Sequence, residues 1–384
     1  MRIIDCDVHP SDDDGAIAQY MPESLRKLPV GGDNMWPSPI GVLREDARTP
    51  SGGVAASDPA YTFDHWMDPY GVEKAVLLPG GALGMGIIAN QYVAAGRTRA
   101  TNDWLIDKWL NFSPRYLGAL VVTPQFPDEA VKEIRRLGRH PQLVQIVMAS
   151  ATRIPLGQRC YWPIYEEALN HGLHISVHPG TEGKGVANGF IAGPPSTYLE
   201  WHTNIPQNYM GQITSLVCEG VFEHFPQLKF LAVEGGLAWI PGVLWRLDKN
   251  WKALRHMTPW LKKLPSEYII EHVRFTSQPS EEPENHAHFM ALMEMIHAEK
   301  TLMFSSDYPH WDNDSPAHGL PRLPQGLAER IYHKNAEELY GDKLGPKIEI
   351  PPAKYKPAIS GAPLPGVTAA GAGAETRKNE AVLV

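Results

Sequence analysis

A short apolar stretch near the N-terminus ends in two residues that could do chemistry together. Residues 2–9 read Arg-Ile-Ile-Asp-Cys-Asp-Val-His, which predicts a strand ending in Asp7 and His9. Side chains two positions apart on a strand point the same way, so we expect both to reach toward one point. A carboxylate and an imidazole placed together can bind a divalent metal ion or move protons. Asp5, two positions earlier, is either a further candidate or a buried hydrogen-bond acceptor.

Polar side chains also follow three later predicted strands. His178 follows the fifth strand, Glu234 the sixth and Asp307 the eighth. Taken singly, each has an ordinary explanation, because an aspartate before a helix is often an N-cap and a histidine after a strand is often a loop residue. Together, two imidazoles and two or three carboxylates would form a mixed nitrogen and oxygen site suited to Zn²⁺, Mn²⁺ or another first-row metal.

The rest of the chain predicts the elements that would hold these residues. Strands rich in Val, Ile and Leu alternate with amphipathic helices, which is typical of a parallel sheet with both faces buried. The predicted strands cover residues 2–7, 74–79, 116–123, 143–148, 173–177, 229–233, 273–276 and 301–304. The predicted helices cover residues 63–70, 89–111, 127–137, 161–170, 205–225, a segment after 236 up to about 254, 283–298 and 323–340.

Eight such strands predict an α/β fold, a (β/α)₈ TIM barrel, whose active site lies at the C-terminal ends of the strands. A doubly wound open sheet is the alternative, but it normally has a glycine-rich turn after its first strand. Here that turn is Asp-Val-His-Pro. The barrel would therefore gather the polar residues at its strand ends on one face.

The domain organisation is predicted from composition along the chain. We expect residues 1–346 to form one barrel with loop insertions at about 10–60, 180–204 and 256–271, which lack a clear strand–helix alternation. Residues 347–384 are rich in Pro, Ala, Gly and Lys, so we expect an extended or disordered tail. Such a tail could lie on a neighbouring subunit, and we expect a homodimer or a larger homo-oligomer.

Net charge, cysteine content and apolar runs indicate what kind of molecule the protein binds and where it is located. The chain has 384 residues and a net charge of −8, which argues against nucleic acid and against an anionic membrane surface. Its three widely spaced cysteines indicate a reducing compartment without a disulfide framework. No apolar run approaches the roughly 18 residues of a membrane span, and charges interrupt the first apolar run, so no signal peptide is expected. We expect a cytoplasmic protein that acts on a small molecule.

Several residues near the predicted rim could contact that molecule. Trp239 could line a pocket, as could Trp201 and Trp311. His310 and Arg153 could anchor an anionic substrate group.

Five stretches of the chain together resemble a known family. The chain is similar to the amidohydrolase-related proteins of the aminocarboxymuconate-semialdehyde decarboxylase group, within the superfamily of metal-dependent hydrolases. The resemblance covers roughly residues 1–345 and is carried by Asp-Cys-Asp-Val-His-Pro at 5–10, Ile-Ser-Val-His-Pro-Gly at 175–180, Phe-Pro-Gln-Leu-Lys-Phe-Leu-Ala-Val-Glu-Gly-Gly at 225–236, Phe-Ser-Ser-Asp-Tyr-Pro-His at 304–310 and Lys-Asn-Ala-Glu-Glu-Leu-Tyr at 334–340.

This resemblance implies a barrel with one catalytic divalent metal ion, Zn²⁺ in the first instance and Mn²⁺ as the alternative. In the family, a His-x-His, Glu-x-His or similar pair on the first strand binds the metal, and those positions are Asp7 and His9 here. The strand-five ligand falls on His178, and the strand-eight aspartate, which binds metal and handles a proton, falls on Asp307. Many family decarboxylases have a histidine where this chain has Glu234.

These features support three functional hypotheses. The first is a metal-dependent hydrolase of a small aromatic or carboxylated metabolite, in which the metal activates water, Asp307 transfers protons, and Glu234 orients the substrate or acts as a base. The alternative is a non-oxidative decarboxylase on the same scaffold, in which the metal binds the substrate carboxylate and a neighbouring hydroxyl and Asp307 protonates the ring carbon. The third is a barrel that only binds, which predicts a missing ligand residue, whereas every expected ligand position is filled.

Overall fold

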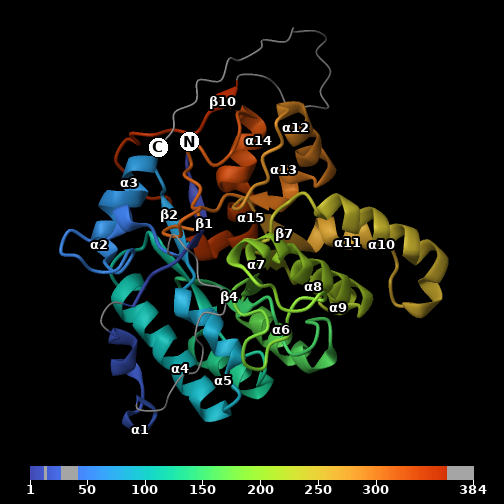
Figure 1. Ribbon diagram of the computed structural model, residues 1–384, viewed down its shortest axis with the longest axis horizontal. Helices are drawn as coiled ribbons and strands as arrows, with labels where there is room; N and C mark the ends of the chain where they lie inside the picture. The colour runs from blue at the N-terminus through green and yellow to red at the C-terminus, as the bar shows by residue number, and fades with distance from the viewer. Residues whose placement is uncertain (13–14, 27–41, 361–384) are drawn as a thin grey trace.

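The computed structural model describes residues 1–12, 15–26 and 42–360, and its centre is one sheet of eight parallel strands. The strands lie side by side in chain order from β1 to β8 (Figure 1). They are β1 (Ile4–Val8), β2 (Lys74–Leu77), β3 (Tyr116–Val121), β4 (Leu143–Ala149), β5 (His174–His178), β6 (Phe230–Ala232), β7 (Val273–Thr276) and β8 (Leu302–Met303).

The two edges of this sheet meet, which brings the first strand beside the last. The backbone N–H of Cys6 donates to the carbonyl of Phe304 at 3.1 Å, and the N–H of His9 donates to that of Tyr308 at 2.8 Å. The N–H of Asp307 donates back to the Asp7 carbonyl at 3.1 Å. The sheet is therefore a nearly closed barrel, and the predicted (β/α)₈ fold is confirmed.

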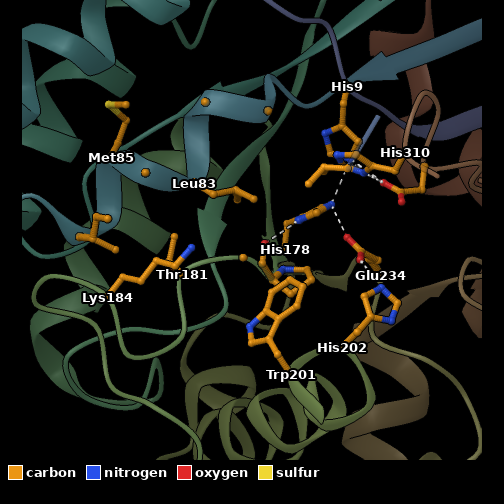
Figure 2. A pocket seen from close by; sticks show the side chains of 18 of the residues that line it. His9, Leu83, Met85, His178, Thr181, Lys184, Trp201, His202, Glu234 and His310 are labelled. Atoms are coloured by element: carbon orange, nitrogen blue, oxygen red, sulfur yellow. Dashed lines mark hydrogen bonds and ion pairs between the residues drawn. The ribbon is translucent and has the colours of Figure 1, made fainter. Parts of the chain in front are cut away.

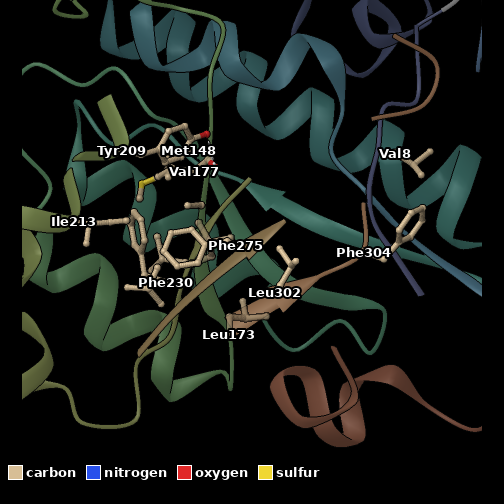
Figure 3. Packing of buried hydrophobic residues seen from close by; sticks show 14 of the residues in the cluster. Val8, Met148, Leu173, Val177, Tyr209, Ile213, Phe230, Phe275, Leu302 and Phe304 are labelled. Atoms are coloured by element: carbon tan, nitrogen blue, oxygen red, sulfur yellow. Dashed lines mark hydrogen bonds between the residues drawn. The ribbon is translucent and has the colours of Figure 1, made fainter. Parts of the chain in front are cut away.

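Alternate residues of the strands pack into two separate apolar clusters. The smaller cluster fills the barrel interior, and its members include Ile4, Val76, Leu117, Leu231 and Met303. The larger cluster lies between the strands and the surrounding helices, where Tyr209 and Ile213 pack against Phe230 (Figure 3). Both faces of each strand are buried, which explains the nearly continuous apolar runs in the sequence.

Helices follow the strands around the outside of the barrel. They are α1 (Glu23–Arg26), α2 (Pro59–Thr62), α3 (Asp68–Tyr70), α4 (Gln91–Trp104), α5 (Pro127–Leu137), α6 (Trp162–Asn170), α7 (Tyr198–Asn204), α8 (Pro206–Cys218), α9 (Val221–His224), α10 (Ile240–Leu254), α11 (Pro265–His272), α12 (His286–Met295), α13 (Ala298–Thr301), α14 (Gln325–Glu329) and α15 (Asn335–Tyr340). Among the described helices, none has both the length and the apolar character needed to cross a membrane.

Several helices differ from the sequence-based prediction. The helix expected over 323–340 begins at Gln325, because Leu323 and Pro324 form a short strand. The helix expected over 205–225 is interrupted at Gly220, whose φ of 75° is left-handed and separates α8 from α9. Within the loop expected at 180–204, α7 forms a helix whose N-cap is Thr197. The Thr197 side chain accepts from the N–H of Glu200, and the Glu200 carboxylate accepts from the N–H of Thr197 in return.

The first part of the predicted tail runs along the barrel as irregular backbone. The N–H of Ile348 donates to Glu73 at 3.0 Å, and the Tyr355 ring lies 5.2 Å from the Tyr70 ring. A short strand, β10 (Ile359–Ser360), pairs with β9 (Leu323–Pro324). Residues 361–384 of the predicted tail, and residues 13–14 and 27–41 of the first predicted insertion, lie outside the described residues.

Candidate metal centre

Four side chains that the sequence places far apart meet at the C-terminal ends of the strands. Asp7, His9, His178 and Asp307 each offer one ligand atom, and these atoms all lie within 4.8 Å of one another. All four residues are buried. The shortest separations are between His9 Nε2 and Asp307 Oδ1 at 2.9 Å, and between His9 Nε2 and Asp7 Oδ1 at 3.1 Å.

Both imidazoles have their outer nitrogen already engaged. Nδ1–H of His9 donates to the Leu78 carbonyl at 2.7 Å, and Nδ1–H of His178 donates to the Pro179 carbonyl at 2.9 Å. Backbone carbonyls of this kind fix the tautomer that leaves Nε2 available to a metal. The two Nε2 atoms face each other at 3.2 Å. Two lone pairs or two protons would repel at this distance, whereas one shared cation satisfies both nitrogens.

Carboxylate oxygens complete a cation-binding arrangement around these nitrogens. Both oxygens of Asp7 and Oδ2 of Asp307 are buried without a hydrogen-bond donor among the described residues. Unpaired buried carboxylate oxygens are costly, and a divalent cation removes this cost. The donor set of two nitrogens and two carboxylates therefore fits a single divalent metal ion, as predicted.

The charges of the four side chains also favour a bound cation. Burial raises the pKa of Asp7, but the neighbouring His9 and His178 outweigh burial and hold that pKa well below its usual range. Burial lowers the pKa of His9, but Asp7 and Asp307 raise it to about 10. The carboxylates thus attract positive charge to the two Nε2 atoms. Either protons or a metal ion can bind these nitrogens, and the two compete.

Two of the acidic residues have strained backbones. Glu234 has a φ of 56° and Asp307 a φ of 61°, a region that side chains other than glycine rarely adopt. Such conformations persist only where surrounding contacts enforce them, and they concentrate at functional sites. Both residues lie a few positions after the ends of β6 and β8, and both side chains contact the histidines of the cluster.

Of the two alternatives for Asp5, the structure shows the hydrogen-bond acceptor, which holds the turn after β8. Its Oδ2 accepts from the Ser306 hydroxyl at 2.6 Å and from Trp66 Nε1–H at 3.1 Å, and its Oδ1 accepts from the Ser306 N–H at 2.9 Å. The pairing register of β1 shifts between Asp5 and Val8. The two carboxylates therefore contact different groups, although side chains two positions apart on a regular strand point the same way.

Glu234 lies between the proposed ligands and a second histidine. Its Oε2 lies 2.9 Å from His178 Nε2, and its Oε1 lies 3.6 Å from His202 Nε2. His202 also lies 3.3 Å from Asp312 Oδ2. Burial lowers the pKa of His202, but the two carboxylates raise it to about 10, so His202 carries a positive charge between them.

A pocket of about 380 Å³ opens onto the cluster. Its size is that of sites for small ligands. Figure 2 shows His9, His310, Glu234 and His202 on one side of the pocket and Lys184 on the opposite side. The remaining lining includes the glycine-rich segment after β2 and the loop after β5, with Gly80, Gly81, Leu83, Gly84, Met85, Ile87, Arg97, Pro179, Gly180, Thr181, Tyr198 and Trp201.

The structure brings some predicted substrate residues to this pocket and not others. His310 lines it, and its Nδ1–H donates to Asp307 Oδ1 at 2.6 Å. Trp239 instead lines a separate groove beside α10, where its Nε1–H donates to the Gly235 carbonyl at 2.8 Å. Arg153 is exposed and does not line the pocket.

Sequence reasoning missed four charged residues of the pocket. His202 and Lys184 lie in the predicted loop at 180–204, Asp312 follows the strand-eight motif, and Arg97 lies on α4. For His202 a signal was present, because Thr197 and Glu200 have the spacing of a helix capping box. Nothing local distinguishes Arg97 from Arg99, the other arginine of its helix.

Known proteins share this architecture. A curated relative, the gamma-resorcylate decarboxylase of Polaromonas sp. (strain JS666 / ATCC BAA-500), is 23% identical over 296 residues, which is 71% of this chain and 85% of that protein. An amidohydrolase from Mycobacterium avium subsp. paratuberculosis K-10 has a TM-score of 0.67 at 19% identity, over 88% of this chain and 99% of that chain.

A third protein was crystallised with a metal. The dihydroxybenzoic acid decarboxylase of Polaromonas sp. JS666, with bound manganese and the inhibitor 2-nitroresorcinol, has a TM-score of 0.58 at 17% identity and covers 88% of this chain and 97% of that chain. The family model described as Amidohydrolase matches residues 4–341. The resemblance noted in the sequence is confirmed, and the chain belongs to the amidohydrolase family.

Proposed function

We propose that this protein is a metal-dependent, non-oxidative decarboxylase of a hydroxylated aromatic carboxylic acid. This is the alternative of the sequence-based hypotheses, and the relatives support it better than they support a hydrolase, since two of the three compared proteins are decarboxylases. The observation that carries the proposal is the buried group of two histidines and two aspartates at the base of a ring-sized pocket.

Asp7, His9, His178 and Asp307 would hold the metal. The ion, when bound, supplies positive charge that attracts and orients the anionic oxygens of a substrate. Zn²⁺ and Mn²⁺ both suit these donors, and the manganese in the decarboxylase neighbour favours Mn²⁺.

The chain's own residues supply the proton that decarboxylation consumes. The reaction places a proton on the ring carbon that carries the carboxylate. The bond to that carboxylate then breaks, its electron pair returns to the ring, and CO₂ leaves. Asp307 is the proton donor in this proposal, and His310 returns a proton to it across the 2.6 Å contact between Nδ1 and Oδ1.

Glu234 and His202 orient the site in this proposal. Glu234 faces His178 on one side and His202 on the other, so it fixes both rings. His202 lines the pocket and presents a positive charge to a substrate hydroxyl or carboxylate. Leu83 and Met85 form an apolar wall that can pack against an aromatic ring (Figure 2).

The proposal is tested by following the atoms of the reaction. Protein loaded with Mn²⁺ is incubated with a panel of hydroxybenzoates in D₂O, and released CO₂ and the products are measured. We expect one mole of CO₂ per mole of product, with deuterium on the ring carbon that lost the carboxylate. Asp307→Asn should lower this turnover by about 10²- to 10⁴-fold.

The competing hydrolase is distinguished by labelled water. A hydrolase transfers oxygen from H₂¹⁸O into an organic product, whereas the proposed decarboxylation leaves the aromatic product unlabelled. Organic ¹⁸O incorporation without CO₂ release, on aryl esters or lactones tested beside the acids, would overturn the proposal.

A further inference from the structure

A groove on the outside of the barrel has no part in the proposed reaction. It has a volume of about 820 Å³ and lies between α8 and α10, with the segment after α10 at one end. Figure 1 shows α10 extending away from the barrel beside α11. Trp239, predicted from the sequence to line a substrate pocket, lines this α10 groove instead.

Large apolar side chains of the α10 groove are exposed. Leu254 is 48% exposed, Met257 65% and Trp260 42%, and all three line the groove. Trp245 is 61% exposed as well, but it lies on the opposite face of α10 and does not line the groove. Contiguous exposed apolar surface marks a place where another macromolecule binds, and tryptophan is enriched at the core of protein interfaces.

One end of the groove is basic. Exposed cations follow one another toward the C-terminal end of α10 and just beyond it: Lys249, Lys252 and Arg255. No described carboxylate forms an ion pair with any of the three, whereas the nearby Lys262 pairs with Glu223 at 2.6 Å. This end therefore presents positive charge to whatever occupies the groove.

The other end of the groove is bordered by acidic residues. Glu281, Glu282 and Glu284 are exposed in the loop before α12. Glu281 Oε2 accepts from the N–H of Ala238 at 3.1 Å, and Ala238 lines the groove. Because α10 has 15 residues, about 20 Å of helix separates the acidic end from the basic end.

We propose that the α10 groove binds a second copy of this chain, with the two α10 helices antiparallel about a two-fold axis. In this arrangement the basic end of each α10 meets the acidic loop of the other copy, so the attraction occurs twice. A parallel arrangement would instead place like charges together. Each copy covers the exposed Leu254, Met257 and Trp260 of the other. The proposal does not depend on the reaction at the metal centre.

A second copy fits this surface better than a membrane does. A flat lipid surface leaves a concave groove unfilled, whereas the projecting side chains of a helix can enter it. An anionic lipid surface would also face the acidic loop at 281–284, and the chain as a whole has a net charge of −8.

The test measures self-association of the full chain. Analytical ultracentrifugation over a range of protein concentrations gives the Kd of the dimer. We expect Leu254→Lys to raise this Kd by about 10- to 100-fold, because it places a charge in the apolar contact. Trp245→Lys is the matched control, since it makes the same change at a more exposed position outside the groove and should leave the Kd unchanged.

Charge reversal tests the antiparallel arrangement. One variant combines Lys252→Glu with Arg255→Glu, and the other combines Glu282→Lys with Glu284→Lys. Each should raise the Kd of its own dimer by about 10-fold or more, because like charges then meet at both ends. A mixture of the two variants should form a heterodimer about as tight as the parent dimer. All four residues are exposed, so the variants should fold, which circular dichroism checks.

Three outcomes would overturn the proposal. A dimer that is equally tight in Leu254→Lys and in both charge variants would place the contact elsewhere on the chain. Charge variants that weaken the dimer but do not associate with each other would exclude the antiparallel arrangement. A parent protein that stays monomeric and sediments with phosphatidylserine vesicles would assign the α10 groove to a membrane instead.

Discussion

At the scale of single residues, the site is defined by which nitrogen and oxygen atoms lack a partner within the protein. The hydrogen bonds of His9 and His178 to backbone carbonyls leave both Nε2 atoms facing inward, and the Asp7 oxygens face them unpaired among the described residues. Each side chain is thereby committed to one orientation before any ligand arrives. Such prior orientation is what allows a site to bind and to react without rearrangement.

Removing one of these nitrogens should release the metal. We expect His178→Ala to weaken metal binding by at least about 100-fold, since even loss of an outer-sphere partner typically costs 10- to 100-fold. Metal content after dialysis, measured by mass spectrometry, checks this. His171→Ala is the control, because His171 precedes the other end of β5. Retention of a full equivalent of metal by His178→Ala would contradict the ligand assignment.

His310 should affect turnover without affecting metal content. Its contact with Asp307 is a charge-assisted hydrogen bond, and loss of such a bond costs about 1.5–3 kcal/mol, or roughly 10- to 100-fold in kcat. We expect His310→Gln to show this loss with a full equivalent of metal bound. His318→Gln provides the comparison, because His318 lies in the same region and contacts Ser315 rather than the site. A loss of metal with His310→Gln would instead make His310 a ligand.

At the scale of elements, the turn after β8 depends on a carboxylate from β1. Asp5 accepts bonds from both the N–H and the hydroxyl of Ser306, the residue directly before Asp307. An amide in this place turns one acceptor into a donor, so Asp5→Asn should lower the free energy of unfolding by about 1–3 kcal/mol. Urea denaturation measures this. Asp58→Asn, at the N-cap of α2, should change stability little, since Asp and Asn cap helices equally well.

The opposite end of β5 should give stability a pH dependence. Burial lowers the pKa of His174 to about 4, whereas an unfolded histidine titrates near 6.5. The unfolded state therefore binds more protons between these values, and the stabilisation, complete above about pH 6.5, is lost as the pH falls toward 4. We expect His174→Gln to flatten this part of the stability profile, as measured by urea unfolding at several pH values. Parallel profiles for the two proteins would contradict the assignment.

The sequence predicts a helix or strand well where residues at its ends mark its start and stop. For α5, Pro127 at the first turn and the acidic residues after it mark the start, and the predicted bounds 127–137 match. The strand predicted at 273–276 also matches β7. In contrast, α7 follows a Gly- and Pro-rich stretch, and its capping box is visible only when that stretch is not dismissed as loop. The register shift in β1 has no sequence signal, so the separate role of Asp5 was left open.

For the site, the sequence predicts the residues at or shortly after the C-terminal ends of strands. Asp7, His9, His178 and Asp307 were identified because barrel geometry gathers such positions. Residues that arrive from helices and long loops, such as His202 and Arg97, depend on how those segments fold back over the barrel. No local pattern encodes that path.

At the scale of the whole molecule, metal binding should contribute to stability. A ligand that binds only the folded state stabilises it in proportion to the logarithm of its concentration relative to Kd, about 2.7 kcal/mol at a hundredfold excess. We expect treatment with a chelator to lower Tm by several degrees and addition of Mn²⁺ to restore it. Differential scanning calorimetry with and without metal checks this. A Tm that is independent of metal would show that the cluster holds no ion in the folded protein.

The proposed metal site lies where β1 meets the segment after β8, so it can form only after nearly the whole barrel has been synthesised. Asp7 and Asp307 meet where the first strand is bonded to the segment after the last, with Asp307 N–H donating to the Asp7 carbonyl. The ligands are therefore separated by nearly the whole barrel in sequence, and a ribosome must release the eighth strand before they can assemble. An ion bound there would link the first strand to the segment after the last strand. A partly synthesised chain that lacks Asp307 has three of the four proposed ligands but no closed barrel to hold them together, so we expect metal binding to be completed only after the barrel has closed.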